Sequence, residues 1–68
     1  MNDLNEAITL HRQGNFHKAE KIYINLLKKD KNNSQLLQLI GTLNFQIKKY
    51  KIAEEYLLKS LNEDPFNS

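Results

Sequence analysis

The 68-residue sequence contains no cysteine and no tryptophan, a single proline and only two glycines. Without cysteine, the chain has neither a disulfide framework nor a thiolate metal site to compensate for a small core. A chain of this size buries only ~60% of the surface that its unfolded form exposes, so its stability is marginal. The absence of cysteine also agrees with a reducing compartment, and we expect a cytoplasmic protein.

A strong excess of one charge and a long apolar run are also lacking. Ten basic and eight acidic residues leave a net charge of +2, which is too small to indicate nucleic-acid binding on charge alone. No run approaches the ~18–20 apolar residues of a membrane span. The first ten residues, MNDLNEAITL, lack the apolar core of a signal peptide. We therefore predict a soluble protein without a membrane partner, and nucleic acid is disfavoured as a ligand.

The sequence patterns of common active sites are missing too. The two glycines are isolated and form no phosphate-binding loop, and no serine lies in a nucleophile elbow. Glu54 and Glu55 are adjacent, so on a helix they point in different directions. His17 and Glu20 share a helix face, but nothing near them supplies a third metal ligand. We predict no catalytic residue, no metal site and no cofactor.

The chain does contain an internal repeat with a period of 34 residues. The matching pairs are Ala19-Glu20 with Ala53-Glu54, Leu27 with Leu61, Asp30 with Asp64, and Asn33-Ser34 with Asn67-Ser68. A fixed period of this length indicates one supersecondary unit that is used twice. Stacked helical repeats build extended surfaces, so the repeat favours binding over catalysis in an enclosed pocket.

Amphipathic periodicity predicts four helices, over residues 2–13, 16–29, 33 or 34 to 47, and 50–62. Gly14 ends the first helix, because glycine adopts the left-handed conformation of a C-cap. Asn15 is expected to cap the second helix with its side-chain oxygen. Lys48 corresponds to Gly14 through the repeat, so it should adopt a positive φ at a cost on the order of 1 kcal/mol.

The apolar positions predict how these helices pack in an all-α fold. The third helix is apolar around most of its circumference, which is typical of a helix between two neighbours. The residues expected on the buried stripes of the second and fourth helices are Phe16, Ala19, Tyr23, Leu26 and Leu27, then Tyr50, Ala53, Tyr56, Leu57 and Leu61.

The second half of the chain resembles a tetratricopeptide repeat. The residues at the spacing of the pattern W-x2-L-G-x2-Y…A-x3-F…P are Leu37, Ile40, Gly41, Asn44, Ala53, Leu57 and Pro65. Gly41 and Ala53 would let two helices approach closely. The first half fits less well, since Asp3 and Glu6 stand at usually apolar positions, as suits an N-terminal cap. The resemblance implies two antiparallel hairpins, residues 1–33 and 34–68, stacked as a short α–α superhelix.

For function, the resemblance implies a non-catalytic scaffold that binds a peptide or partner helix in a concave groove. The groove positions carried over are Leu4, Asn5, Ile8, His11, Arg12, Gln38, Leu39, Thr42, Phe45 and Gln46. Packing or solvent exposure of His11 is favoured over ligand contact. The co-chaperone subgroup grips a C-terminal carboxylate with lysines and asparagines, but those positions hold Leu4, Ile8 and Leu39 here. We therefore expect no carboxylate clamp.

Two repeats are fewer than the roughly three that a stable stack needs. By analogy with the second helix, an apolar face at the end of the chain should be uncovered, and such a face marks an association site. Its residues are Leu57, Leu58, Leu61 and Phe66. We predict a homo-oligomer, most simply a dimer.

Two alternatives to self-association stay open. The chain could be a fragment whose missing repeats cover this face. Residues 7–30 are also similar to the opening repeat of bacterial tetratricopeptide proteins, some of which carry a glycosyltransferase domain. That similarity implies, as the alternative function, the N-terminal recognition region of a larger glycosyltransferase.

Overall fold

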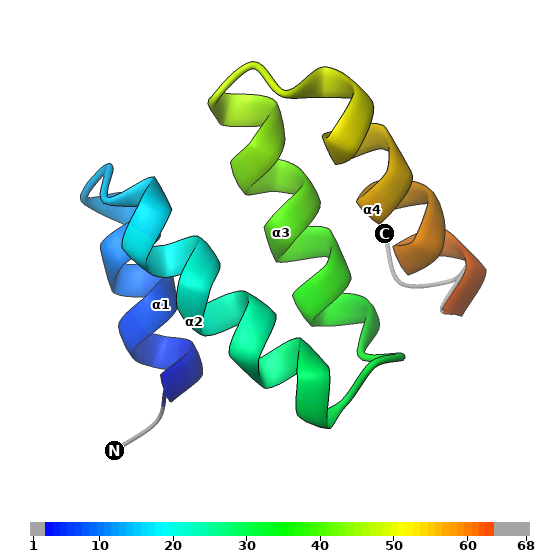
Figure 1. Ribbon diagram of the computed structural model, residues 1–68, viewed down its shortest axis with the longest axis horizontal. Helices are drawn as coiled ribbons and strands as arrows, with labels where there is room; N and C mark the ends of the chain where they lie inside the picture. The colour runs from blue at the N-terminus through cyan, green and yellow to red at the C-terminus, as the bar shows by residue number, and fades with distance from the viewer. Residues whose placement is uncertain (1–2, 64–68) are drawn as a thin grey trace.

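The structure, a computed structural model, describes residues 3–63. This part of the chain contains four α-helices and no strand. The helices are α1 (Asp3–Arg12), α2 (Phe16–Lys29), α3 (Ser34–Gln46) and α4 (Tyr50–Glu63). The predicted all-α class is confirmed. Each helix packs against its neighbour in sequence, and successive helices run in opposite directions (Figure 1). Within this part of the chain, no helix combines the length and the apolar character needed to cross a membrane.

The α1–α2 turn and the α3–α4 turn have the same backbone hydrogen bonds, displaced by 34 residues. The four N–H to C=O pairs are Asn15 to Leu10 (2.9 Å), Gly14 to His11 (3.1 Å), Lys49 to Asn44 (2.8 Å) and Lys48 to Phe45 (3.1 Å). In each turn the two bonds form a Schellman motif, which satisfies carbonyls that the end of a helix leaves without partners. The sequence repeat is therefore also a repeat of backbone conformation.

Lys48 occupies the left-handed position of the second turn, with a φ of 67° where Gly14 has 87°. This confirms the predicted positive φ. Because glycine avoids the steric cost of this conformation, Lys48→Gly is expected to raise the free energy of unfolding by about 1 kcal/mol in urea titrations. The reciprocal Gly14→Lys should lower it by a similar amount, since a Cβ at Gly14 meets nothing within 4 Å and only backbone strain acts. Equal stability of Lys48→Gly and the parent would show that Lys48 is unstrained.

The two asparagines that precede α2 and α3 act differently. The prediction for Asn15 was wrong: its side chain makes no capping hydrogen bond, and its φ and ψ of −82° and 63° are not the extended conformation of a capping residue. Its N–H is instead held in the Schellman turn. Asn33 does have an extended backbone, and its Oδ1 accepts from the N–H of Leu36 at 3.1 Å. The side-chain cap therefore lies at the start of α3.

Helix α3 lies between α2 and α4, as its apolar circumference predicted (Figure 1). On the α2 side, the buried core consists of Ala7, Ala19, Tyr23, Leu36, Ile40 and Leu43. On the α4 side, α3 approaches closely at Gly41, where an added Cβ would lie 2.7 Å from Leu57 Cγ and 3.3 Å from the Ala53 carbonyl oxygen. This confirms the close crossing predicted at Gly41 and Ala53.

Candidate interaction surface

Large exposed apolar side chains gather on the outer face of the α3–α4 hairpin. Phe45, Tyr50, Leu58 and Leu61 are each between 51% and 59% exposed. They line a groove of about 340 Å³, here called the α4 groove, whose residues are Phe45, Tyr50, Ala53, Glu54, Leu57, Leu58 and Leu61. The rings of Phe45 and Tyr50 meet edge to face at 5.3 Å. The side chains of this surface are apolar apart from the Glu54 carboxylate and the Tyr50 hydroxyl.

The same face exists on the first hairpin, where α3 covers it. The residues 34 positions before those of the α4 groove are His11, Phe16, Ala19, Glu20, Tyr23, Ile24 and Leu27. Ala19 and Tyr23 are fully buried there, and Leu27 is half-buried against the core. Leu61, the equivalent of Leu27, is 51% exposed. The two faces thus differ in whether a helix lies on them, and within residues 3–63 nothing covers the second.

Polar side chains attach α3 to the first hairpin at two points. Asn44, only 1% exposed, donates from Nδ2 to the Ile40 carbonyl at 2.8 Å and to Glu20 Oε2 at 3.3 Å. His11 is hydrogen-bonded through Nδ1 to the Tyr23 hydroxyl at 3.2 Å and through Nε2 to Oε1 of Gln46. The bonds of Asn44 to Glu20 and of Gln46 to His11 thus join α3 to both helices of the first hairpin.

Tyr23 is the titratable group that this packing perturbs. Its side chain is fully buried, and desolvation raises the pKa of its phenol above the ordinary value of 10.0. Burial acts in this direction because it disfavours the charged phenolate.

Three of the residues predicted for the concave partner groove lie in two separate places. His11 and Gln46 contact each other and so join α1 to α3. Phe45 lies in the α4 groove with Tyr50 instead. Of the remaining positions, Leu4, Ile8, Gln38 and Leu39 are half-buried, and Asn5, Arg12 and Thr42 are exposed. The concave groove as a binding site stays a prediction.

The structure brings together three of the residues predicted for self-association, Leu57, Leu58 and Leu61. The fourth, Phe66, lies outside the described residues. Sequence reasoning missed Phe45 and Tyr50 as members of this face. Tyr50 and Leu61 were expected on the buried stripe of the fourth helix, and that prediction was wrong for both, because the α4 groove has no counterpart of α3 to cover it. The repeat offered one signal for Tyr50. It is the equivalent of Phe16, which α3 helps to cover in the first hairpin, and no helix in residues 3–63 follows α4 to cover Tyr50.

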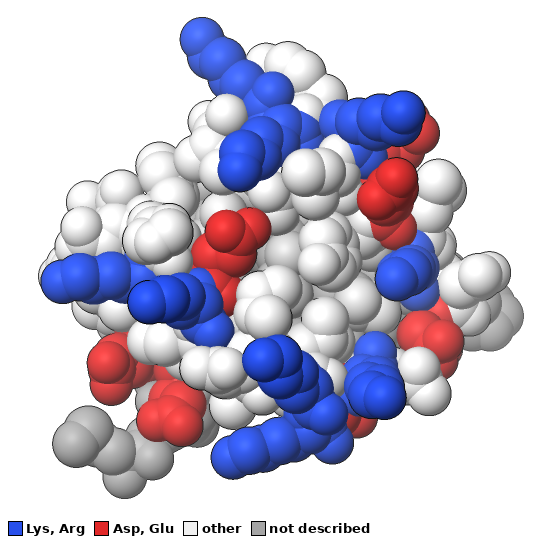
Figure 2. All heavy atoms as spheres, viewed as in Figure 1, with Lys and Arg blue, Asp and Glu red and all other residues white. Residues whose placement is uncertain are grey.

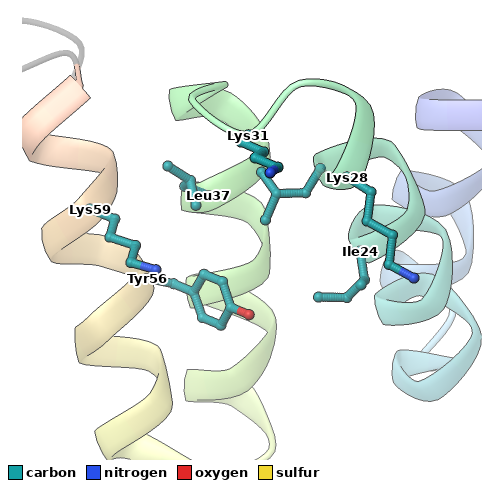
Figure 3. A pocket seen from close by; sticks show the side chains of 7 residues that line it. Ile24, Lys28, Lys31, Leu37, Tyr56 and Lys59 are labelled. Atoms are coloured by element: carbon teal, nitrogen blue, oxygen red, sulfur yellow. The ribbon is translucent and has the colours of Figure 1, made fainter.

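A second hollow, of about 300 Å³, lies between α2, α3 and α4 and carries lysines on its rim (Figure 3). Its apolar floor includes Ile24, Leu37 and Tyr56, with Tyr56 extending from α4 across α3. Lys28 lies in the last turn of α2, where it complements the helix dipole. Lys59 Nζ lies 6.0 Å from the centre of the Tyr56 ring. Lys28 and Lys59 thus each have a favourable electrostatic interaction within the chain, so their presence on the rim does not indicate a ligand.

Charged side chains on the face viewed in Figure 2 are mixed in sign. Lysine and arginine side chains lie mostly toward its edges with acidic side chains among them, and an uncharged band crosses the middle. A nucleic-acid surface would instead present a continuous basic stripe. In residues 3–63, no three histidine or acidic side chains converge in a way that could hold a metal ion.

Comparisons with known proteins add no identification. Neither the models of protein families nor the searches of curated proteins and solved structures gave a match. The tetratricopeptide resemblance therefore stays a prediction that rests on the spacing of its residues in this sequence.

Proposed function

We propose that this chain is a non-catalytic protein-interaction module of the tetratricopeptide kind, which binds a peptide or partner helix at the α4 groove. One observation carries the proposal. The face on which the first hairpin holds α3 recurs 34 residues later with its large apolar side chains exposed. Contiguous exposed apolar surface is a mark of association sites. In this proposal residues 1–33 and 34–68 are the two repeats, and the second of them presents this surface.

In the absence of another ligand, two copies would pair through the α4 groove as a homodimer. The opposite end of the molecule is not suited to cover it. Asn5, Glu6 and Thr9 on α1 are exposed and polar, whereas the α3 residues 34 positions later are apolar and pack on α2. Head-to-tail stacking would place polar side chains on an apolar groove, which is unfavourable. Pairing of the same face on both copies instead places apolar side chains on apolar side chains and gives a closed dimer.

Leu61→Glu is expected to dissociate this dimer, because it places a carboxylate among apolar side chains that association would bury. Sedimentation equilibrium at micromolar concentrations should give twice the 8.0 kDa chain mass for the parent and 8.0 kDa for the variant. Ile52→Glu is the matched control. Ile52 is also exposed on α4, but it lies in a different hollow with Glu55 and Lys59, so its variant should remain a dimer.

Two outcomes would contradict these statements separately. A well-folded monomer for the parent chain would refute self-association. A dimer that persists in Leu61→Glu would refute the α4 groove as the contact surface.

A further inference from the structure

The α4 groove contains a single charged residue, Glu54, and the first hairpin shows what a carboxylate at that position does. Its equivalent, Glu20, accepts a hydrogen bond from Nδ2 of Asn44 at 3.3 Å. Asn44 is almost fully buried and belongs to the helix that lies on the face. The carboxylate thus receives a donor from the docked helix. Glu54 lies at the same register of an exposed groove.

The docked helix also shows which apolar pattern the face accepts. Leu36, Ile40 and Leu43 of α3 share one buried cluster with Ala19 and Tyr23 of the first hairpin. Ile47, which follows α3, packs against the same cluster. With Leu36 as position i, the apolar residues stand at i, i+4, i+7 and i+11, and the amide of Asn44 stands at i+8. The helix runs antiparallel to the helix that receives it (Figure 1).

We infer that the α4 groove takes an amphipathic helix of this kind, antiparallel to α4, with a hydrogen-bond donor at i+8 that reaches Glu54. This inference rests on the proposed function and deepens it by naming the partner's chemistry. Glu54 is the specificity-determining residue. It selects helices with an amide or a cationic side chain at i+8, and it rejects those with a carboxylate, because like charges in a desolvated contact repel.

The small size of the surface and its few apolar anchors indicate a weak complex. Phe and Tyr side chains bury ~150–250 Å² each when fully covered, and Phe45 and Tyr50 are only 59% and 56% exposed. One helix on seven groove residues therefore belongs to the small interfaces, below about 1,200 Å² in total, that serve weak or transient complexes. We therefore expect weak binding, with a dissociation constant on the order of 1–100 μM.

The probe is a peptide of residues 33–48 of this chain with the substitution Gly41→Ala. The substitution favours helix formation. It also disfavours replacement of α3 by the peptide within the hairpin, since a Cβ at Gly41 would press against Leu57. Anisotropy of the labelled peptide should show micromolar binding to the full chain, and sedimentation should show the homodimer converting to a one-to-one complex. Leu58→Glu in the chain should weaken binding at least tenfold, whereas Ile52→Glu should not.

A charge exchange then tests Glu54. The peptide with Asn44→Asp should bind the parent chain at least tenfold more weakly, because it presents a carboxylate instead of a donor. Glu54→Gln in the chain should restore binding of this peptide. Glu55→Gln is the matched control, since Glu55 lies in the hollow around Ile52 and Tyr56 instead. Restoration by Glu54→Gln alone supports the inference.

The outcomes separate this inference from the proposed function. A homodimer that Leu61→Glu dissociates, but that the peptide neither binds nor disrupts, overturns the inference and leaves the proposed function standing. Binding that does not distinguish the Asn44 peptide from its Asp variant overturns the role of Glu54. A chain that neither dimerises nor binds the peptide overturns both.

Discussion

Gly41→Val is expected to remove a large part of the folding stability of the chain. A Cβ at this position would lie 2.7 Å from Leu57 Cγ, 2.8 Å from Leu57 Cδ2 and 3.3 Å from the Ala53 carbonyl oxygen, and valine adds two methyl groups beyond that. Overpacking of this kind costs about 1–3 kcal/mol or more. In a chain of fewer than about 70 residues, the hydrophobic core rarely supplies more than ~3–5 kcal/mol of folding stability. Far-UV circular dichroism with urea titration measures the loss.

A double-variant cycle separates the collision at Gly41 from other effects of the substitution. Gly41→Ala alone combines a gain of about 1 kcal/mol in helix propensity with the contact to Leu57, so it should be neutral or mildly destabilising. In a chain that already carries Leu57→Ala, the same Gly41→Ala should be more favourable than in the parent, because the side chain that it meets is gone and only the contact with the Ala53 carbonyl oxygen remains. Equal effects in both backgrounds would show that α3 and α4 do not cross closely at Gly41.

The features that the sequence predicted best depend on local rules and on the repeat. The bounds of α2 are those predicted, because a glycine turn precedes it and a polar turn follows its lysines. The positive φ of Lys48 followed from its equivalence to Gly14. The crossing at Gly41 and Ala53 followed from two small residues on facing helices. Each of these predictions depended only on the conformation of one segment, or on the packing of the two helices within one hairpin.

The features that sequence reasoning missed depend on what each face meets in the folded chain. Tyr50 has the backbone position of Phe16, but α3 lies only on the first of the two faces, so Tyr50 is 56% exposed. Asn44 stands where the tetratricopeptide pattern has tyrosine, and its bond to Glu20 depends on the packing of α3 against α2, which the spacing does not specify. The two hairpins thus share the same backbone conformation, but their equivalent faces have different neighbours. The candidate surface is the face that α3 covers in the first hairpin and that no helix of residues 3–63 covers in the second.

Tyr23→Ala is expected to abolish folding of the chain. Tyr23 is among the largest fully buried side chains, at 0% exposure, and it lies in the core cluster that joins the first hairpin to α3. Replacing a buried aromatic side chain with alanine costs about 3–5 kcal/mol, which equals the whole stability expected for a core of this size. Circular dichroism without denaturant should show loss of helix, and a cooperative urea transition like the parent's would contradict the central position of Tyr23.

Tyr23→Phe keeps the aromatic ring and so serves as the folded control for this position. It removes the hydrogen bond to His11 Nδ1 and should lower the free energy of unfolding by about 1 kcal/mol near neutral pH. Because burial raises the pKa of Tyr23 above 10.0, the unfolded chain gives up the phenol proton first, and parent stability falls as the pH rises above about 10. Tyr23→Phe lacks this contribution, so the difference between the two proteins should shrink from about pH 8 to about pH 11 in paired urea titrations. A difference that stays constant over this range would show that the Tyr23 phenol titrates alike in the folded and unfolded chains.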